Sequence, residues 1–265
     1  MPSRPTSRRA SLKTSTHIQA QRARIEELEA ALWDDGLNES VLEDYQAAYR
    51  VLEDLLVAGP EDRRHHFVVV IPVADSPQHL KTCLDSLLTL CRSYGYGGIY
   101  RGRYRKVSVL LADDSADPAV IDFNREIAHN FEQSGINTHY FGMREQQALM
   151  RRLHALNLEA VVGVHPPGAF SHKGQAMMRN IAYLKLAEMQ STMPGQRLLF
   201  YTIDSDQEFK VKVATPQGGR SLYGVNYLYQ LDRIFDQTDA QVLTGKVVGD
   251  PPVSPAVMAV STPRK

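Results

Sequence analysis

Short apolar runs alternate with amphipathic segments along most of the chain. The runs at 67–76 (FVVVIPVADS), 107–115 (VSVLLADDS), 136–142 (INTHYFG) and 198–209 (LLFYTIDSDQEF) are rich in β-branched and aromatic residues. The first is apolar almost without interruption, which is typical of a strand buried on both faces of a parallel sheet. The alternation predicts an α/β fold, with a mostly parallel, Rossmann-like sheet flanked by helices.

The segments between these runs carry apolar residues at helical spacing. Helices are expected over residues 80–91, 118–134, 144–160, 176–190 and about 222–236. A glycine-rich turn near 218–219 precedes the last of these helices, and a further strand is expected at 241–248 (QVLTGKVV).

The first 60 residues have a different pattern. Residues 1–17 contain basic residues, no acidic residue and no apolar periodicity, which predicts a disordered basic tail. Residues 18–60 form two amphipathic stretches separated at Gly36 and predict a helical hairpin in front of a domain at 64–265. The first stretch has apolar residues at near-heptad spacing, namely Ile18, Ile25, Leu28 and Leu32.

This apolar stripe has two interpretations. It can pack on the main domain, as amphipathic helices of globular proteins usually do. Alternatively, it can form a homodimer through a short coiled coil of the N-terminal helices.

Charge and composition limit the partners. The 265 residues include 30 basic and 30 acidic ones, so the formal net charge is zero. A broad nucleic-acid-binding face usually has an excess of Lys and Arg, so no nucleic acid partner is expected and any phosphate contact must be local. The longest apolar run, residues 67–74, is far shorter than the roughly 20 residues that cross a bilayer, so no membrane span is expected.

Cys83 and Cys91 lie on one apolar helical stripe as core residues, which fits a cytoplasmic protein.

Acidic residues follow the expected strands at their carboxyl ends, where open α/β sheets bind ligands. Asp75 follows the first strand, Asp113 and Asp114 the second, and Asp204 and Asp206 the last. The first strand is followed by no GxGxxG motif, which argues against a dinucleotide site.

The Asp204-Ser205-Asp206 triplet directs both carboxylates to the same side of an extended chain. One or both could hold a hard divalent cation such as Mg²⁺ or Mn²⁺, with waters and substrate phosphates as further ligands. The spacing alone fits a capped strand end equally well.

Four segments occur in a characteristic order: IPVADS (71–76), LLADDS (110–115), HKGQAMMRN (172–180) and LFYTIDSDQEF (199–209). This order resembles the nucleotide-sugar-binding half of family 2 glycosyltransferases, which have the GT-A fold. The resemblance implies that the backbone of the first strand's loop holds the base and ribose.

The remaining roles are carried over residue by residue. The loop corresponds to Pro72, Val73 and Asp75, and the aspartate that reads the nucleobase corresponds to Asp113, with Asp114 beside it. A later helix of the family begins Gly-x-x-x-x-Arg-Asn, which Gly174, Arg179 and Asn180 match, and the Asp-x-Asp motif corresponds to Asp204 and Asp206.

The resemblance implies metal-dependent transfer of a sugar from a nucleotide-diphosphate donor to an acceptor that the sequence does not identify. Asp206 would hold the cation between the two phosphates, and Asp204 would lie near the ribose or donor sugar. The cation would stabilise the charge of the leaving diphosphate as a Lewis acid. Lys173 suits the diphosphate but fits a solvated loop lysine equally, whereas Arg179 suits an ion pair with the acidic rim better than a substrate contact.

The chain departs from the family at two loops. Asp75-Ser76 stands where the family usually has Asn-Glu, and Ser115-Ala116 where it usually has Gly-Ser. These differences are expected to alter nucleotide affinity or identity.

The catalytic base is the weakest part of the resemblance. Inverting members have a carboxylate well beyond the Asp-x-Asp strand, where this chain offers only Asp250, in a Gly-Asp-Pro-Pro run typical of a turn. The ending at Lys265 looks like an interrupted fold, as expected if a longer protein is truncated at its C-terminus. His172 is retained as a candidate substrate contact because it adjoins Lys173.

Two other functions remain open. A nucleotide-sugar-binding or partner-binding module without transferase activity would explain the missing base. A sugar nucleotidyltransferase would need a glycine-rich, arginine-containing loop after the first strand, and the absence of glycine there counts against it.

Overall fold

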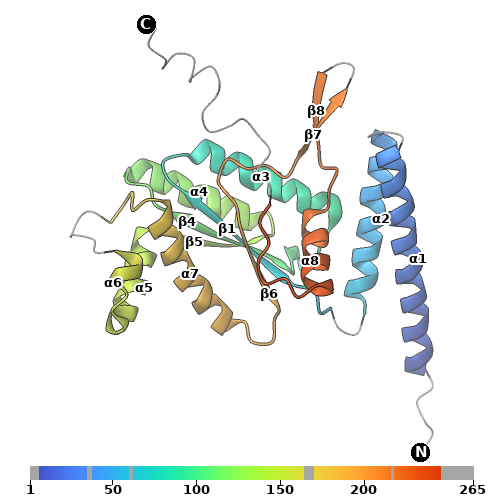
Figure 1. Ribbon diagram of the computed structural model, residues 1–265, viewed down its shortest axis with the longest axis horizontal. Helices are drawn as coiled ribbons and strands as arrows, with labels where there is room; N and C mark the ends of the chain where they lie inside the picture. The colour runs from blue at the N-terminus through green and yellow to red at the C-terminus, as the bar shows by residue number, and fades with distance from the viewer. Residues whose placement is uncertain (1–5, 35–37, 60–61, 164–169, 216–217, 246–265) are drawn as a thin grey trace, which may run out of the picture.

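The apolar run at 67–73 forms a central, almost completely buried strand of a parallel sheet. The computed structural model describes residues 6–34, 38–59, 62–163, 170–215 and 218–245. The sheet has the order β5-β4-β1-β6 (Figure 1). Its strands are β1 (His66–Val73), β4 (Val107–Asp113), β5 (Asn137–Phe141) and β6 (Leu198–Thr202), all parallel. The predicted α/β fold with a parallel sheet is confirmed.

Side chains of β1 enter two separate cores because successive residues of a strand point to opposite faces. Val69 and Ile71 pack in one cluster, and Val68 and Val70 in the other. All four are at most 2% exposed. Because both faces of β1 are buried, apolar β-branched side chains are favourable at successive positions and not only at alternate ones. This explains the continuous apolar run in the sequence.

Helices cover both faces of the sheet (Figure 1). One face packs against α3 (Pro77–Tyr94), α4 (Pro118–Gln133) and α8 (Tyr227–Gln237), and the other against α5 (Met143–Leu153), α6 (Glu159–Val162) and α7 (Gln175–Thr192). In the described part of the chain, no helix is both long and apolar enough to cross a membrane.

The expected helix over 144–160 is interrupted. The α-helix ends at Leu153, a 3₁₀ turn spans His154–Leu156, and Asn157 has a positive φ of 50° before α6 begins. Asparagine tolerates this left-handed conformation better than most residues, so it ends the helix without a glycine.

Two other expectations about strands are wrong. The run at 198–209 is extended only to Thr202, and residues 241–245 form no strand. The rest of the expected last strand, 246–248, lies outside the described residues.

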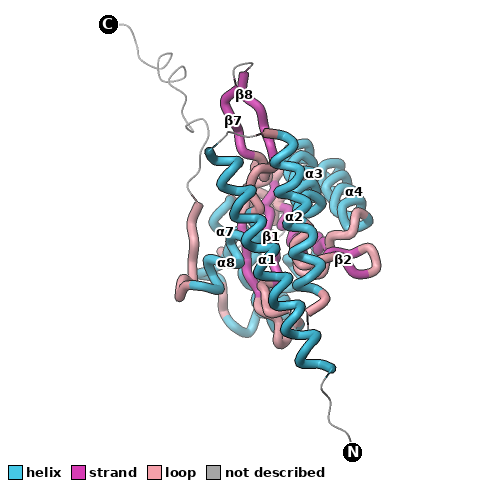
Figure 2. The backbone as a smooth tube through the Cα atoms, turned by 90° about the vertical axis from the view of Figure 1, so that its right-hand side faces the viewer, coloured by secondary structure: helices cyan, strands magenta, loops and turns pink. Residues whose placement is uncertain are grey.

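The structure also contains two small antiparallel sheets. They join β2 (Ile99–Tyr100) to β3 (Arg103–Tyr104) and β7 (Val211–Thr215) to β8 (Gly218–Leu222). Because β8 continues to Leu222, the last helix begins later than expected, at Tyr227, where the Asn226 side chain accepts a hydrogen bond from the Tyr229 N–H. The β7–β8 hairpin projects from one end of the molecule (Figures 1 and 2).

The N-terminal segment forms the predicted helical hairpin. Helix α1 (Thr6–Asp34) lies beside α2 (Glu39–Val57), as Figure 2 shows. The predicted disordered tail of residues 1–17 is wrong from Thr6 onward, because α1 already begins there. The segment from Thr6 to Asp34 contains no proline or glycine, so the helix continues beyond the apolar stripe that the prediction required.

Aromatic packing attaches the hairpin to the domain. Tyr49 of α2 makes edge-to-face contacts with Tyr45, with Tyr94 of α3 and with Tyr229 of α8, at centroid distances of 5.0 to 5.4 Å. This geometry is favourable beyond the buried area alone. The stripe residues Ile25, Leu28 and Leu32 belong to the same buried cluster, and α1 packs against α2 of the hairpin.

Charged groups strengthen the junction between hairpin and sheet. The Arg64 guanidinium donates to both carboxylate oxygens of Glu53 at 2.7 Å and to Asp62 at 2.9 Å. Glu53 also accepts from the Gly97 N–H at 2.8 Å, and only 1% of the residue is exposed. Both oxygens of the buried carboxylate therefore have donors, which offset part of its cost of desolvation, and burial still raises the pKa of Glu53 to about 7.

Removing the central ring of the tyrosine cluster should destabilise the protein. We expect Tyr49→Ala to lower the free energy of unfolding by about 4 kcal/mol, because a large buried ring is replaced by a cavity. Tyr49→Phe keeps the ring and should cost less than about 1 kcal/mol. Tyr183→Ala serves as the control, because Tyr183 is 58% exposed. Urea unfolding measures all three, and equal losses for Tyr49→Ala and Tyr183→Ala would contradict the role of the cluster.

His66 should make stability depend on pH. Burial and the nearby Lys106 lower the pKa of His66 to about 4. In the unfolded chain His66 takes up a proton near pH 6.5, whereas in the folded protein it stays neutral down to about pH 4. The stability that comes from keeping His66 neutral is therefore fully present above pH 6.5 and is lost as the pH falls toward 4. From about pH 7.5 to about pH 5, His66 should account for about 2 kcal/mol of lost unfolding free energy. Urea unfolding of His66→Gln should show this loss reduced, and an unchanged pH dependence would refute the assignment.

Candidate functional site

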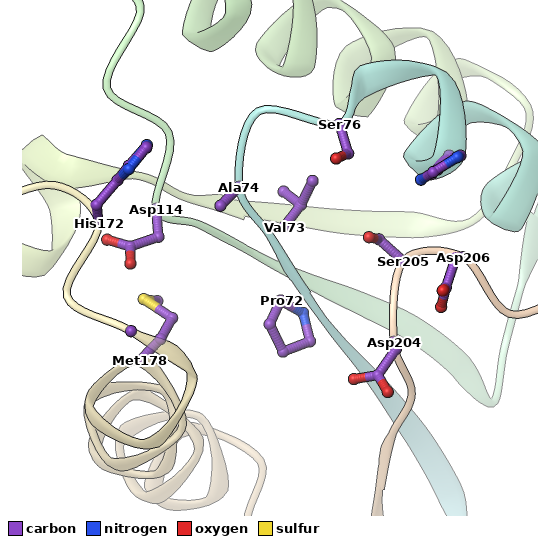
Figure 3. A pocket seen from close by; sticks show the side chains of 12 residues that line it. Pro72, Val73, Ala74, Ser76, Asp114, His172, Met178, Asp204, Ser205 and Asp206 are labelled. Carbon is purple, nitrogen blue, oxygen red and sulfur yellow. The ribbon is translucent and has the colours of Figure 1, made fainter. Parts of the chain in front are cut away.

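A cavity of about 500 Å³ opens at the carboxyl edge of the sheet, where β1 and β6 end (Figure 3). From β1 the chain proceeds to β4 and β5 on one side and then returns to β6 on the other. The cavity therefore lies at the topological switch point, the place where open α/β sheets bind ligands. Seven of the candidate residues line it: Pro72, Val73, Asp114, His172, Gly174, Asp204 and Asp206.

The loop after β1 forms one wall. Besides Pro72 and Val73, this wall contains Ala74, Ser76 and His79. Ala74 belongs to the loop of residues 72–75 predicted from the sequence. Sequence reasoning missed Ser76 and His79, which lie at the start of α3, immediately after that loop.

The acidic triplet after β6 forms another wall. The Ile203 N–H donates to the Val70 carbonyl at 3.0 Å, which places Asp204 beside the end of β1. Arg179 of α7 lies 3.6 Å from the Asp204 carboxylate, as expected of a residue that braces the acidic rim. The Asp204 side chain is 49% exposed, and Figure 3 displays Asp204 and Asp206 on the same side of the cavity. Both carboxylates can reach a bound ligand.

Asp113 does not face the cavity, contrary to the role implied for it. The residue is 2% exposed, and its carboxylate accepts hydrogen bonds from the Ser115 N–H at 2.9 Å, Asn124 at 3.1 Å and the Tyr140 hydroxyl at 2.6 Å. Its backbone carbonyl accepts from the Gln146 amide at 2.8 Å. The donors occupy both carboxylate oxygens, so Asp113 holds the end of β4 in place.

Tyr140 is suited to this buried contact. Burial raises the pKa of the phenol, and its hydrogen bond to Asp113 raises the pKa further. The hydroxyl therefore keeps its proton and remains a donor to the carboxylate.

The next residue, Asp114, lines the cavity and forms an ion pair with Lys173. The Lys173 side chain is only 1% exposed; its ammonium also donates to the Phe170 carbonyl at 2.7 Å and lies 4.5 Å from the centre of the Phe170 ring. Lys173 is thus neither a solvated lysine nor presented to the cavity. Its charge instead neutralises Asp114 and fixes the loop that precedes α7.

Gly174 begins the wall formed by α7. Its φ of 83° is in the left-handed region that favours glycine, and a Cβ there would meet no heavy atom within 4 Å. The first N–H groups of a helix have no intrahelical partner and carry partial positive charge. Because Gly174 and Met178 line the cavity, this helix start lies at its edge.

Asp75 does not line the cavity but contacts a residue that does. Its carboxylate contacts Nε2 of His172, whose side chain is 55% exposed and lines the cavity. The other carboxylate considered as a base, Asp250, lies outside the described residues.

The acidic wall fits a particular kind of metal site. Within the described ranges there is no group of three or more His, Cys, Asp or Glu side chains that could hold a metal ion. Mg²⁺, however, is commonly bound by one or two carboxylates together with waters and substrate phosphates. Asp204 and Asp206 therefore fit a cation that binds together with a phosphorylated ligand, and do not fit an ion held by the protein alone.

Removing the Asp113 carboxylate should destabilise the fold. Asp113→Ala leaves buried donors without an acceptor, so we expect the free energy of unfolding to fall by about 3 kcal/mol. Asp206→Ala removes an exposed carboxylate and should change the free energy by less than about 0.5 kcal/mol. Chemical denaturation of both variants tests this difference. An Asp113→Ala protein as stable as the wild type would contradict the structural role of Asp113 and make it a candidate ligand contact again.

Neither a scan of protein-family models nor a search of curated proteins matched this chain. The resemblance to family 2 glycosyltransferases therefore rests on its four sequence segments alone.

Proposed function

We propose that this protein is a GT-A-like, metal-dependent glycosyltransferase that transfers a sugar from a nucleotide-diphosphate donor. The observation that carries the proposal is the cavity at the switch point, which has Asp204 and Asp206 on one wall and the start of α7 on another. A diphosphate needs compensation of its negative charge from several directions. A cation at the acidic wall and the N–H groups of a helix start supply it together.

The nucleoside would lie along the loop after β1. Pro72, Val73 and Ala74 provide a largely apolar wall there. Because Asp113 is buried, the nearest acidic group for base or ribose contacts is Asp114. Its charge is already compensated by Lys173, so it suits hydrogen bonding better than binding of a second cation.

Departure of the nucleoside diphosphate is the step that the site must assist. A cation held by Asp206 and Asp204 would act as a Lewis acid toward the leaving phosphate oxygens. Arg179, 44% exposed and paired with Asp204, keeps that carboxylate oriented toward the cavity rim. The α7 start adds fixed partial positive charge that needs no reorganisation during the reaction.

Thermal unfolding with sugar nucleotides tests the donor site. With UDP-glucose or GDP-mannose at about 100 times its Kd and with Mn²⁺, the midpoint should rise by about 5 °C, because binding to the native state adds about 2.7 kcal/mol. The sugar nucleotide with EDTA in place of Mn²⁺ should give almost no shift, because the diphosphate then lacks its cation. Mn²⁺ without nucleotide should also give almost no shift, because two carboxylates alone bind the ion weakly.

Variants make this test specific. Asp206→Ala should lose the shift, whereas Asp85→Ala, which removes a 59% exposed carboxylate on α3, should retain it. A shift that is independent of metal, or retained in Asp206→Ala, would contradict the proposed site. Stabilisation without release of nucleoside diphosphate would favour a binding module over a transferase.

A further inference from the structure

A histidine and an aspartate meet at the cavity from two different loops. His172 precedes α7 and Asp75 follows β1, and Nε2 of the imidazole contacts the Asp75 carboxylate. His172 lines the cavity, as Figure 3 shows, and more than half of its side chain is exposed. The pair has the arrangement of a general base held by an orienting carboxylate.

Both residues have strained backbones. The φ angles are 51° for Asp75 and 52° for His172, in the left-handed region, which aspartate and histidine adopt more often than most residues other than glycine but still uncommonly. Such strain persists only where surrounding contacts enforce it, and it is concentrated at functional sites. Here the strain brings the two side chains into contact.

The contacts that enforce this geometry converge on the turn after β4. The His172 N–H donates to the Asp114 carbonyl at 3.1 Å, and the Asp75 N–H donates to the Ser115 hydroxyl at 3.0 Å. The buried Lys173–Asp114 pair fixes the chain next to His172. The dyad is therefore positioned before any ligand binds.

The contact with the Asp75 carboxylate favours a proton on Nε2 and leaves Nδ1 as the basic nitrogen. When Nε2 carries the proton and donates to the carboxylate, Nδ1 holds the free electron pair. Among the described residues, Nδ1 has no hydrogen-bond partner. The carboxylate also stabilises the imidazolium that forms when Nδ1 takes up a proton.

The other ionisable groups of the cavity are less suited to act as a base. Asp114 is paired with Lys173, and Asp204 with Arg179. Asp206 is assigned to the cation. His79 lines the cavity without a carboxylate partner in the described part of the chain.

We propose that His172 is the general base that deprotonates the acceptor hydroxyl and that Asp75 is its positioning residue; this inference rests on the proposed glycosyltransferase function. The hydroxyl proton passes to Nδ1, and the oxygen forms a bond to the anomeric carbon. The bond from that carbon to the β-phosphate oxygen breaks, and its electron pair leaves with the nucleoside diphosphate. The dyad would take the role for which the sequence otherwise offers only Asp250.

The experiment measures nucleoside diphosphate release by the full chain with Mn²⁺, using whichever of UDP-glucose and GDP-mannose gives the larger thermal shift and water as the acceptor. His172→Asn should lower turnover by about 100-fold or more, with the Kd for the sugar nucleotide unchanged within about 3-fold. Asparagine is chosen because it tolerates the positive φ. His129→Asn, at an exposed position of α4, is the matched control and should retain full turnover.

Two further measurements separate catalysis from structure. His172→Gly, which also tolerates the positive φ, should regain turnover when imidazole is added, because the free base replaces the missing side chain. Asp75→Asn should lower kcat by about 10-fold while KM stays the same, as expected of a residue that acts through His172.

Each outcome bears on a separate claim. If the wild-type protein binds neither sugar nucleotide, the proposed function itself fails. If it binds but releases no nucleoside diphosphate, or if His172→Asn turns over at the wild-type rate, the base assignment is overturned and the donor site remains. Lack of rescue by imidazole in a His172→Gly protein that still binds the sugar nucleotide would also overturn the assignment.

Discussion

The buried carboxylate of Asp113 is the interaction on which the edge of the sheet depends. Its donors come from α4, from β5 and from its own turn, and the backbone carbonyl of the same residue is bound by α5. A buried carboxylate is stable only when such donors surround it. The following turn, at Asp114 and Ser115, is thereby rigid enough to anchor the loops that contain Asp75 and His172.

The parallel register then brings the strand ends together. Val73 pairs with Asp113, so β1 and β4 end at the same level, while β6 ends at Thr202, opposite Val70. The segment after β6 consequently passes beside the last residues of β1 and carries its acids to the cavity. The chemistry of the site thus follows from strand lengths as well as from residue types.

Much of this arrangement could be predicted from the sequence. Short runs of apolar, β-branched and aromatic residues identified the strands, and the preference of ligands for the carboxyl ends of parallel strands placed Asp204 and Asp206 at the correct edge of the sheet. The environments of Asp113 and Lys173 could not be predicted, because adjacent aspartates look alike in a sequence and only tertiary contacts decide which one is buried. The helix at residues 6–17 was missed because apolar periodicity reports packing, whereas a helix needs only a chain without helix breakers. The Asp75–His172 contact depends on two positive φ angles, for which neither residue type is a strong signal.

The pairing of β6 with β1 also has a consequence for biosynthesis. His66 of β1 pairs with Leu198 of β6, so β1 cannot complete its pairing until a segment that is synthesised much later has left the ribosome. The strands β1, β4 and β5 can associate earlier, but the ligand cavity has no acidic wall until β6 docks. Contacts of such long sequence separation form slowly. Cavity formation is therefore a late event in folding, and a nascent chain that stops before Leu198 contains three strands of the sheet without the cavity.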